Sequence, residues 1–233
     1  MDQPFPSTKP PPLREVETWI FDLDNTLYPA SCGLFEQIDR KMKAFIRDLL
    51  GVEEEEAHRL QKDYFHRYGT TLRGLMEHHD VDPVGYLDYV HAIDFSPILA
   101  DPDLDAVLDK LWGRKFIFTN GHAAHVSEVL ARLGIAERFD GVFDIMDADF
   151  VPKPSPEIYH RMLDMHGINP ARAAMIDDLP KNLAPAAELG MVTVWLRSDV
   201  GEADCAAWKE HVHYVADDLV AWLQAVAAEG ASG

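Results

Sequence analysis

The second half of the chain alternates short apolar segments with segments of helical periodicity, and this alternation restricts the possible folds most strongly. The predicted strands are rich in β-branched and aromatic residues. One of them, Val16–Phe21, lies near the N-terminus, and the others are Lys115–Thr119, Val142–Ile145, Ala173–Ile176, Met191–Leu196 and His213–Val215. The predicted helices are Asp103–Leu111, His122–Leu133, Ser155–His166, Lys181–Leu189 and Asp217–Ala228. Strands that alternate with helices form parallel β-α-β units with right-handed crossovers. The pattern therefore predicts an α/β fold with a doubly wound parallel sheet.

A long stretch after the first strand interrupts this alternation and carries only helical patterns. Leu34, Ile38 and Met42 recur at helical spacing, and Gly51 follows as a stop signal. Further helical patterns cover residues 53–66, 72–79 and 84–92. We therefore expect a flexible Pro-rich leader at 1–14, a sheet domain built from 15–29 and 97–233, and an all-helical domain inserted at 30–96.

The charge balance of the chain narrows the class of its partners. Lys and Arg number 21 against 40 Asp and Glu, which gives a formal net charge of −19. Such a field repels polyanions, so we expect neither a nucleic-acid polymer nor an anionic membrane as partner. A small phosphorylated metabolite is compatible with this charge if a divalent cation and local donors offset the repulsion. No segment approaches the roughly 18 uncharged apolar residues of a membrane-spanning helix.

The cysteine content and the N-terminal segment indicate the cellular compartment. The chain has two cysteines, Cys32 and Cys205, and they do not form a disulfide framework. Met1–Pro12 lacks the basic and apolar regions of a secretory signal. We therefore expect a cytoplasmic protein, and the oligomeric state stays open between a monomer and a homodimer.

Polar side chains lie at or just beyond the ends of several predicted strands. They are Asp22 and Asp24 after the first strand, Thr119 and Asn120 at the end of the second, Lys153 in a later loop, and Asp177 and Asp178 after another strand. In a doubly wound sheet, ligands bind beyond the carboxyl ends of the strands, where the strand order reverses. We therefore expect these side chains to form one site.

The residue types at these positions suit the hydrolysis of a phosphate ester. Asp22 can attack phosphorus as a nucleophile. Asp24, one residue away from it, can protonate the leaving alcohol and later deprotonate water. Asp177 and Asp178 add negative charge, and an oxygen-rich site of this kind is what Mg²⁺ prefers. A Thr119 hydroxyl with the following N–H groups can hold a phosphate oxygen, and a lysine, Lys153, can neutralise the phosphoryl charge.

Each of these elements also has a purely structural explanation when it stands alone. An Asp-x-Asp pair after a strand commonly forms a turn or a helix cap, and Asp177-Asp178 can cap the next helix. Thr119-Asn120-Gly121 is an ordinary turn before a helix, and Lys153 between two prolines is an ordinary solvated loop lysine. Their occurrence together, in this order and at the ends of predicted strands, favours a catalytic site.

The order Asp22-x-Asp24-x-Thr26, Thr119, Lys153, Asp177-Asp178 resembles the haloacid-dehalogenase-like (HAD) hydrolase superfamily over nearly the whole chain. This resemblance implies a Rossmann-like core, an obligate Mg²⁺ and an aspartyl-phosphate intermediate, with Asp22 as nucleophile and Asp24 as acid and base. It implies a metal site made by Asp22, the Asp24 backbone carbonyl and Asp178, with support from Asp177. The helical insert is similar to a cap domain of the C1 type, which closes over the substrate.

Longer stretches are similar to the pyrimidine 5′-nucleotidase branch of this superfamily. They are Phe21–Pro29, Tyr68–Leu72, Phe118–Gly121, Lys153–Glu157 and Asp177–Asn182. The resemblance implies hydrolysis of UMP or CMP, nucleoside monophosphates, to nucleoside and phosphate. In this hypothesis Asn120 and Gly121 contact the phosphate, and Tyr68, Thr70 and Thr71 of the cap contact the base or the sugar. The Tyr68–Thr71 segment can equally be a simple loop.

Other functions remain as alternatives. A phosphatase for another small metabolite, such as phosphoglycolate or a sugar phosphate, shares the same core motifs. A 2-haloacid dehalogenase shares the fold and the first aspartate, but its attack on carbon needs neither a metal nor an acid and base partner. A non-catalytic binding module would be favoured by the loss of a catalytic carboxylate, and none of the predicted ones is missing from the sequence.

Overall fold

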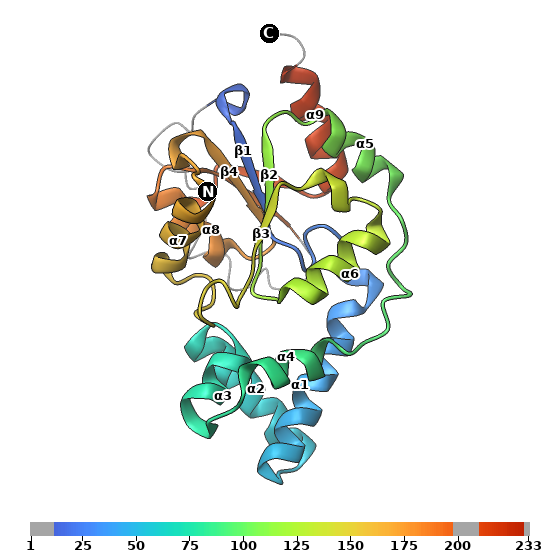
Figure 1. The fold of residues 1–233 in the computed structure, drawn as a ribbon, viewed down its shortest axis with the longest axis vertical. Coiled ribbons are helices and arrows are strands. Elements are labelled where there is room, and N and C mark those ends of the chain that lie inside the picture. Colours follow the sequence, from blue (N-terminus) through green and yellow to red (C-terminus); the bar gives the residue numbers. More distant parts are fainter. Residues whose placement is uncertain (1–11, 198–209, 231–233) are drawn as a thin grey trace, which may run out of the picture.

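The computed structural model describes residues 12–197 and 210–230 of the chain (Figure 1). These residues form a sheet domain and a separate helical insert, which comprises Leu34–His91 and follows the first strand. The insert lies below the sheet domain in Figure 1, on the side where the chain leaves that strand. The predicted α/β fold is therefore confirmed.

The sheet has six strands in the order β3-β2-β1-β4-β5-β6, and every neighbouring pair is parallel. The strands are β1 Thr18–Phe21, β2 Arg114–Phe118, β3 Gly141–Phe143, β4 Ala173–Asp177, β5 Val192–Leu196 and β6 Tyr214–Ala216. The chain crosses from β3 on one edge back to β4 beside β1, so the strand order reverses between β1 and β4. A ligand site is expected beyond the carboxyl ends of these two strands.

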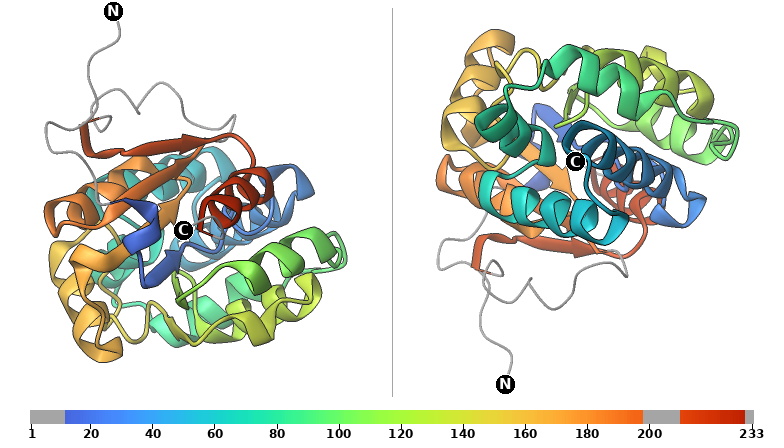
Figure 2. Two further views of the ribbon diagram at one scale, coloured as in Figure 1. Left: turned by 90° about the horizontal axis from the view of Figure 1, so that it is seen from above. Right: turned by 90° about the horizontal axis from the view of Figure 1, so that it is seen from below.

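Helices cover both faces of the sheet (Figure 2). They are α5 Pro102–Lys110, α6 Ala123–Leu133, α7 Pro156–His166, α8 Pro180–Glu188 and α9 Leu219–Gly230. Successive side chains of a strand point to opposite faces. Trp19 and Phe21 of β1 therefore pack in the apolar cluster with α5, α6 and α9, whereas Ile20 packs in the cluster with α7 and α8. All four residues of β1 are buried, as a central parallel strand requires.

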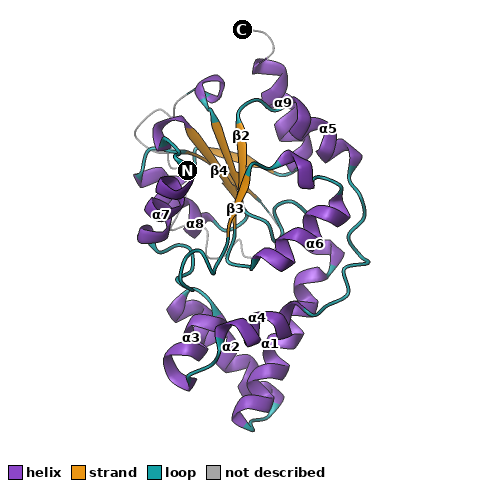
Figure 3. Ribbon diagram, in the orientation of Figure 1, coloured by secondary structure: helices purple, strands orange, loops and turns teal. Residues whose placement is uncertain are grey.

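The helical insert consists of helices joined by loops (Figure 3) and has a small apolar core of its own. Its helices are α1 Leu34–Leu50, α2 Glu54–Tyr68, α3 Thr71–His79 and α4 Pro83–His91. Helix α1 ends at Gly51, which adopts the left-handed conformation with φ 64°. Helix α4 begins after Asp82, whose carboxylate accepts hydrogen bonds from the N–H groups of Val84 and Gly85.

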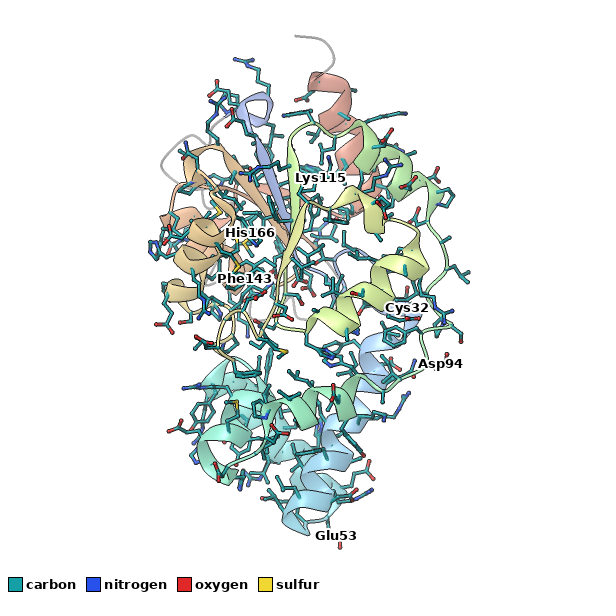
Figure 4. The ribbon with its side chains drawn as sticks, in the orientation of Figure 1. Cys32, Glu53, Asp94, Lys115, Phe143 and His166 are labelled. Atoms are coloured by element: carbon teal, nitrogen blue, oxygen red, sulfur yellow. The ribbon has the colours of Figure 1, made fainter. Side chains whose placement is uncertain are left out.

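Two chain segments connect the insert to the sheet domain, and a third contact comes from a loop. Cys32 and Asp94, labelled in Figure 4, lie in the two connecting segments. Helix α1, which follows the first of these segments, is bonded to the second through Gln37. The Gln37 side-chain amide donates to the Asp94 carbonyl at 2.8 Å and accepts from the Asp94 N–H at 3.0 Å. Ile145 and Phe150, from the loop after β3, pack in the apolar core of the insert. The insert therefore contacts the sheet domain beyond its covalent connections.

Some predicted boundaries differ from the observed ones for local reasons. The strand predicted at Val142–Ile145 ends at Phe143, because the Asp144 carboxylate accepts hydrogen bonds from the N–H groups of Met146 and Asp147 and turns the chain. Most of the predicted leader and Cys205 lie outside the described residues. Within the described part of the leader, a 3₁₀ turn begins at Leu13.

Candidate active site

The polar residues predicted at the strand ends meet at the carboxyl edge of β1, β2 and β4. Asp22 directly follows β1, and its backbone N–H donates to the carbonyl of Ile176 in β4 at 2.9 Å. Asp177 is the last residue of β4. The Lys153 ammonium donates to the carbonyl of Phe118, the last residue of β2, at 2.8 Å. Three adjacent strands thus hold residues that are distant in the sequence.

Lys153 is the centre of the ion pairs in this site. Its Nζ lies 2.7 Å from Asp22 Oδ1 and 2.8 Å from Asp177 Oδ2, and its side chain is 1% exposed. Burial disfavours the charged form, but Asp177 and Asp22 outweigh burial and raise the pKa of Lys153 above its usual value. The ammonium is therefore charged, and its three N–H groups are all used by the two carboxylates and the Phe118 carbonyl.

Asp177 is fully hydrogen-bonded by neighbouring groups. Its Oδ1 accepts from the Leu179 N–H at 2.9 Å and from Asn182 Nδ2 at 3.0 Å. Its Oδ2 accepts from Lys153 at 2.8 Å and from Asn182 at 3.1 Å. Among the described residues, Asp178 has no ion-pair partner, although it is buried. This difference makes Asp178 the carboxylate with free oxygens and Asp177 a support for the site.

The buried carboxylates carry more negative charge than Lys153 can balance. Burial, opposed by Lys153 and assisted by Asp177, raises the pKa of Asp22 to about 7. Burial and the charges of Asp22 and Asp177 also raise the pKa of Asp178 well above its usual value. A second cation would relieve this repulsion and would favour the ionised form of Asp22 that nucleophilic attack requires.

The arrangement of these oxygens fits a magnesium ion. One carboxylate oxygen each from Asp22, Asp177 and Asp178 lies within 4.8 Å of the other two. The donors are all oxygens, which is the ligand type that Mg²⁺ prefers, and Mg²⁺ needs few carboxylates because it keeps several waters. Asp22 and Asp178 are the two that would bind it through their side chains.

Asp24 has different surroundings from Asp22. Its Oδ1 accepts a hydrogen bond from the Tyr28 hydroxyl and lies 2.7 Å from His125 Nε2. Burial raises the pKa of Asp24, but His125 and Tyr28 outweigh burial and lower it to about 2. Asp24 is therefore a carboxylate in this state and is able to accept a proton. The two aspartates have pKa values shifted in opposite directions, as suits different roles in one reaction.

Thr119, Asn120 and Gly121 lie beside these carboxylates. The Gly121 N–H donates to Thr119 Oγ1 at 2.9 Å. The Asn120 side chain accepts from the Lys153 N–H at 2.8 Å and donates to the Lys153 carbonyl at 3.4 Å. The Asn120 amide therefore positions the Lys153 backbone, a role that the sequence did not predict.

The turn between α2 and α3 brings the insert close to the active site. Gly69 occupies this turn with φ 84°, and a Cβ atom built on it would lie 3.0 Å from Pro152 Cγ and 3.3 Å from the Lys153 carbonyl oxygen. Tyr68 and Thr70 flank Gly69, so both belong to a turn that contacts the loop of the predicted catalytic lysine.

The hydroxyl groups of this turn have protein partners. Thr70 Oγ1 accepts from the Arg73 N–H and caps α3. Thr71 is buried, and its Oγ1 donates to the Gln61 carbonyl of α2 at 3.2 Å. This bond holds the Thr71 hydroxyl inside the insert, so we do not propose that Thr71 contacts the substrate.

Several residues of the site were not among the sequence predictions. Thr26 Oγ1 donates to Asp22 Oδ2 at 3.1 Å, and Tyr28 donates to Asp24. Both lie four residues after their partners, so the spacing contained a signal. Asn182 lies in the Asp177–Asn182 stretch, which was noted only for its resemblance. His125 contacts Asp24 across 101 positions of the sequence, and no local pattern indicates such a contact.

Comparison with known proteins agrees with this fold. The model of the haloacid dehalogenase-like hydrolase family matches residues 16–190. The chain belongs to this family. The matched segment contains the strands β1 to β4 of the sheet together with Asp22, Lys153 and Asp177.

Individual relatives and structures extend the comparison. Phosphate metabolism protein 8 of Saccharomyces cerevisiae is 33% identical over 78% of this chain, which spans 61% of that protein. Glyceraldehyde 3-phosphate phosphatase of Pyrococcus furiosus is 27% identical over 94% of this chain and 97% of its own length. A HAD phosphatase of Thermococcus onnurineus shares the fold with a TM-score of 0.62 and 18% identity, over 91% of this chain and 97% of its own. L-2-haloacid dehalogenases also share the fold.

Proposed function

We propose that the protein is a Mg²⁺-dependent phosphomonoesterase that works through an aspartyl-phosphate intermediate on Asp22. The observation that carries this proposal is the buried cluster of Asp22, Asp177 and Asp178 around a single lysine, with Asp24 beside it. A cluster with this excess of negative charge suits a divalent cation and a phosphoryl group together. The names of two relatives support the same reaction class, because one is a phosphatase and the other is a phosphate metabolism protein.

Each residue has a chemical role in this proposal. Asp22 attacks phosphorus, and Asp24 protonates the leaving oxygen and later takes a proton from the attacking water. Mg²⁺, held by Asp22, Asp178 and the Asp24 backbone carbonyl, supplies charge stabilisation to the phosphoryl oxygens when it is bound. Lys153 neutralises Asp22, and the Thr119 hydroxyl and Gly121 N–H reorient from each other to a phosphoryl oxygen.

We infer that the substrate is a small phosphate ester, and we propose a pyrimidine nucleoside monophosphate, UMP or CMP. The similarity of five sequence stretches to pyrimidine 5′-nucleotidases supports this choice. Gly69 lies against the Lys153 loop, and its neighbours Tyr68 and Thr70 would be the residues of the insert nearest to a bound substrate. A second candidate is a smaller three-carbon phosphate, which the name of the Pyrococcus relative favours.

Dehalogenase and non-catalytic functions fit the site less well. A dehalogenase has no use for a cation between Asp22 and Asp178, yet the charges of this cluster call for one. A non-catalytic module would not need Asp22 and Asp24 with pKa values shifted in opposite directions. The described residues contain no helix long and apolar enough to cross a membrane. We propose a cytoplasmic enzyme that acts as a monomer or homodimer.

The test is a phosphate-release screen over nucleoside monophosphates, sugar phosphates and three-carbon phosphates, with Mg²⁺ and with EDTA. We expect release with Mg²⁺, none with EDTA, and a loss of at least about a thousandfold in Asp22→Asn. Activity that persists in EDTA or in this variant contradicts the mechanism. Preference for a three-carbon phosphate over UMP and CMP leaves the mechanism intact and removes the nucleotide assignment.

A further inference from the structure

Asp24 is held by two donors that act on the same one of its oxygens. The Tyr28 hydroxyl donates to Oδ1, and His125 Nε2 lies 2.7 Å from this oxygen. Oδ1 accepts hydrogen bonds both when Asp24 is ionised and when its proton is on Oδ2, so in either case Nε2 carries a proton and donates it. Oδ2 has no hydrogen-bond partner among the described residues. The two oxygens of Asp24 therefore have separate functions, one for anchoring and one left free.

The free oxygen faces the part of the site where we place the phosphoryl group. A Cβ atom built on Gly121 would lie 3.7 Å from Asp24 Oδ2 and 3.3 Å from Thr119 Oγ1. Asp24 Oδ2 thus lies beside the Thr119–Gly121 segment, while Oδ1 points to His125 on α6. Rotation of the carboxylate would remove Oδ2 from this position, and the two donors on Oδ1 oppose such a rotation.

His125 is itself fixed by its surroundings. It is 1% exposed, and its ring centre lies 4.5 Å from that of His91 in α4 and 5.7 Å from that of Phe95. The opposite side of its ring faces Gly121, where a built Cβ would lie 3.4 Å from His125 Cδ2. His91 belongs to the helical insert, so the insert supplies one side of the pocket that holds this imidazole.

The burial of His125 has a cost that packing alone does not explain. Its Nδ1 is buried without a hydrogen-bond partner among the described residues. A buried unpaired polar atom is destabilising, and an apolar side chain of similar volume would avoid that cost. The contribution that distinguishes the imidazole from such a side chain is the hydrogen bond from Nε2 to Asp24.

Resting on the phosphatase function proposed above, we propose that His125 is a positioning residue that directs Asp24 Oδ2 toward the leaving oxygen of the substrate. Asp24 enters the first step in its protonated form, with the proton that the water step of the preceding cycle leaves on Oδ2. The bond from Asp22 to phosphorus forms, the ester P–O bond breaks, and this proton moves from Oδ2 to the leaving oxygen. In the second step water attacks phosphorus, Asp22 leaves, and Oδ2 takes a proton from that water. Over one cycle Asp24 regains the proton that it gave up.

The test compares a substrate whose leaving group needs a proton with one whose leaving group does not. UMP releases an alkoxide that must be protonated, whereas p-nitrophenyl phosphate releases a stable phenolate. We would measure kcat/KM for both substrates in the wild type, His125→Leu and His125→Gln. This parameter ends at formation of the aspartyl-phosphate, so it excludes the water step that both substrates share.

For His125→Leu, we expect kcat/KM for UMP to fall about a hundredfold or more, and that for p-nitrophenyl phosphate to fall only a fewfold. His125→Gln keeps a donor at about the reach of Nε2, so it should recover part of the UMP activity. His166→Gln is the matched control, because His166 is a partly buried histidine that lies on α7, away from the site (Figure 4). It should change neither value.

Equal losses on both substrates, or no loss on UMP, would overturn the positioning role and leave the phosphatase function standing. If His125→Leu does not fold, His125→Gln decides the comparison. Its loss of kcat/KM must then be larger for UMP than for p-nitrophenyl phosphate. A wild-type protein that hydrolyses neither ester would overturn the phosphatase function and, with it, this proposal. If UMP alone is not hydrolysed, the alkyl ester preferred in the screen takes its place.

Discussion

At the scale of single residues, the active site is organised by charge balance in a buried environment. Lys153 contacts both Asp22 and Asp177, and the three side chains have little contact with solvent. Removing one partner from a buried ion pair is strongly destabilising, because it leaves an uncompensated charge. Lys153 should therefore matter both for stability and for catalysis.

Replacement of Lys153 by methionine tests this dual role. We expect Lys153→Met to lose about 3 kcal/mol of unfolding free energy near neutral pH and at least about a hundredfold in kcat/KM. The pKa of Asp22 is already raised to about 7, and it rises further without the lysine. Asp22 is then neutral in acid, so the destabilisation should shrink from about pH 8 to about pH 5.

Urea unfolding at both pH values and steady-state kinetics measure these effects. Lys115→Met is the matched control, since Lys115 is also a largely buried lysine, far from the insert (Figure 4), and among the described residues its ammonium donates only to the Gly113 carbonyl. Equal destabilisation of the two variants at both pH values would mean that the carboxylates near Lys153 are not the cause.

At the scale of elements, two segments bring the helical insert onto the active site. The loop after β3 places Ile145 and Phe150 in the apolar core of the insert and then continues to Lys153. The turn between α2 and α3 places Gly69 against Pro152 of the same loop. One loop of the sheet domain therefore carries both Lys153, the predicted catalytic lysine, and the surface that the insert contacts.

Gly69→Ala tests whether this close approach supports catalysis. The φ of 84° strains any side chain, and the new Cβ would press on Pro152 and the Lys153 carbonyl oxygen. We expect a loss of about 1 kcal/mol in unfolding free energy and a clear fall in kcat/KM as the insert moves off the loop. Gly51→Ala is the matched control, because Gly51 has φ 64° and open space around it.

Steady-state kinetics and urea unfolding of both glycine variants distinguish the effect of backbone strain from the effect of losing the contact with the Lys153 loop. Gly51→Ala should lose stability of the same order but keep its kcat/KM. A Gly69→Ala variant with wild-type kinetics would show that the turn does not have to touch the Lys153 loop during turnover.

At the scale of the whole molecule, the proposed metal ion would compete with protons for the same buried carboxylates. The raised pKa of Asp22 means that the metal-free folded state keeps a proton that the unfolded state has already released. Asp22 therefore makes the metal-free protein less stable as pH rises from about 4 to about 7. Bound Mg²⁺ replaces that proton and removes this loss.

We expect Mg²⁺ to raise the unfolding temperature, and to raise it more at about pH 8 than at about pH 5.5. At a concentration of about one hundred times Kd the stabilisation would be about 2.7 kcal/mol. Thermal unfolding with Mg²⁺ and with EDTA at both pH values measures the increment. Asp178→Asn should reduce it, whereas Asp217→Asn, in an exposed ion pair, should not. An increment that is absent, or independent of pH, contradicts metal binding at these carboxylates.

The sequence by itself determined the α/β alternation, the parallel sheet, the helical insert and the positions of Asp22, Thr119, Lys153 and Asp177-Asp178 near its strand ends. These features follow from local periodicity and from the rule that parallel strands end at one edge, so neighbouring residues are sufficient to predict them. The strand predicted at Val142–Ile145 was observed at Gly141–Phe143, and it ends before Asp144, whose side chain competes with the backbone for hydrogen bonds.

Only the tertiary structure decided which groups surround those residues. The hydrogen bond from His125 to Asp24 and the contact of Gly69 with the Lys153 loop join segments far apart in the sequence. Such contacts depend on how helices pack on the sheet and on where the insert rests, and neither leaves a local pattern. The tertiary structure also decided the pKa values of Asp22 and Asp24. The two residues are close together in the sequence, but burial and partners distant in the sequence shift their pKa values in opposite directions.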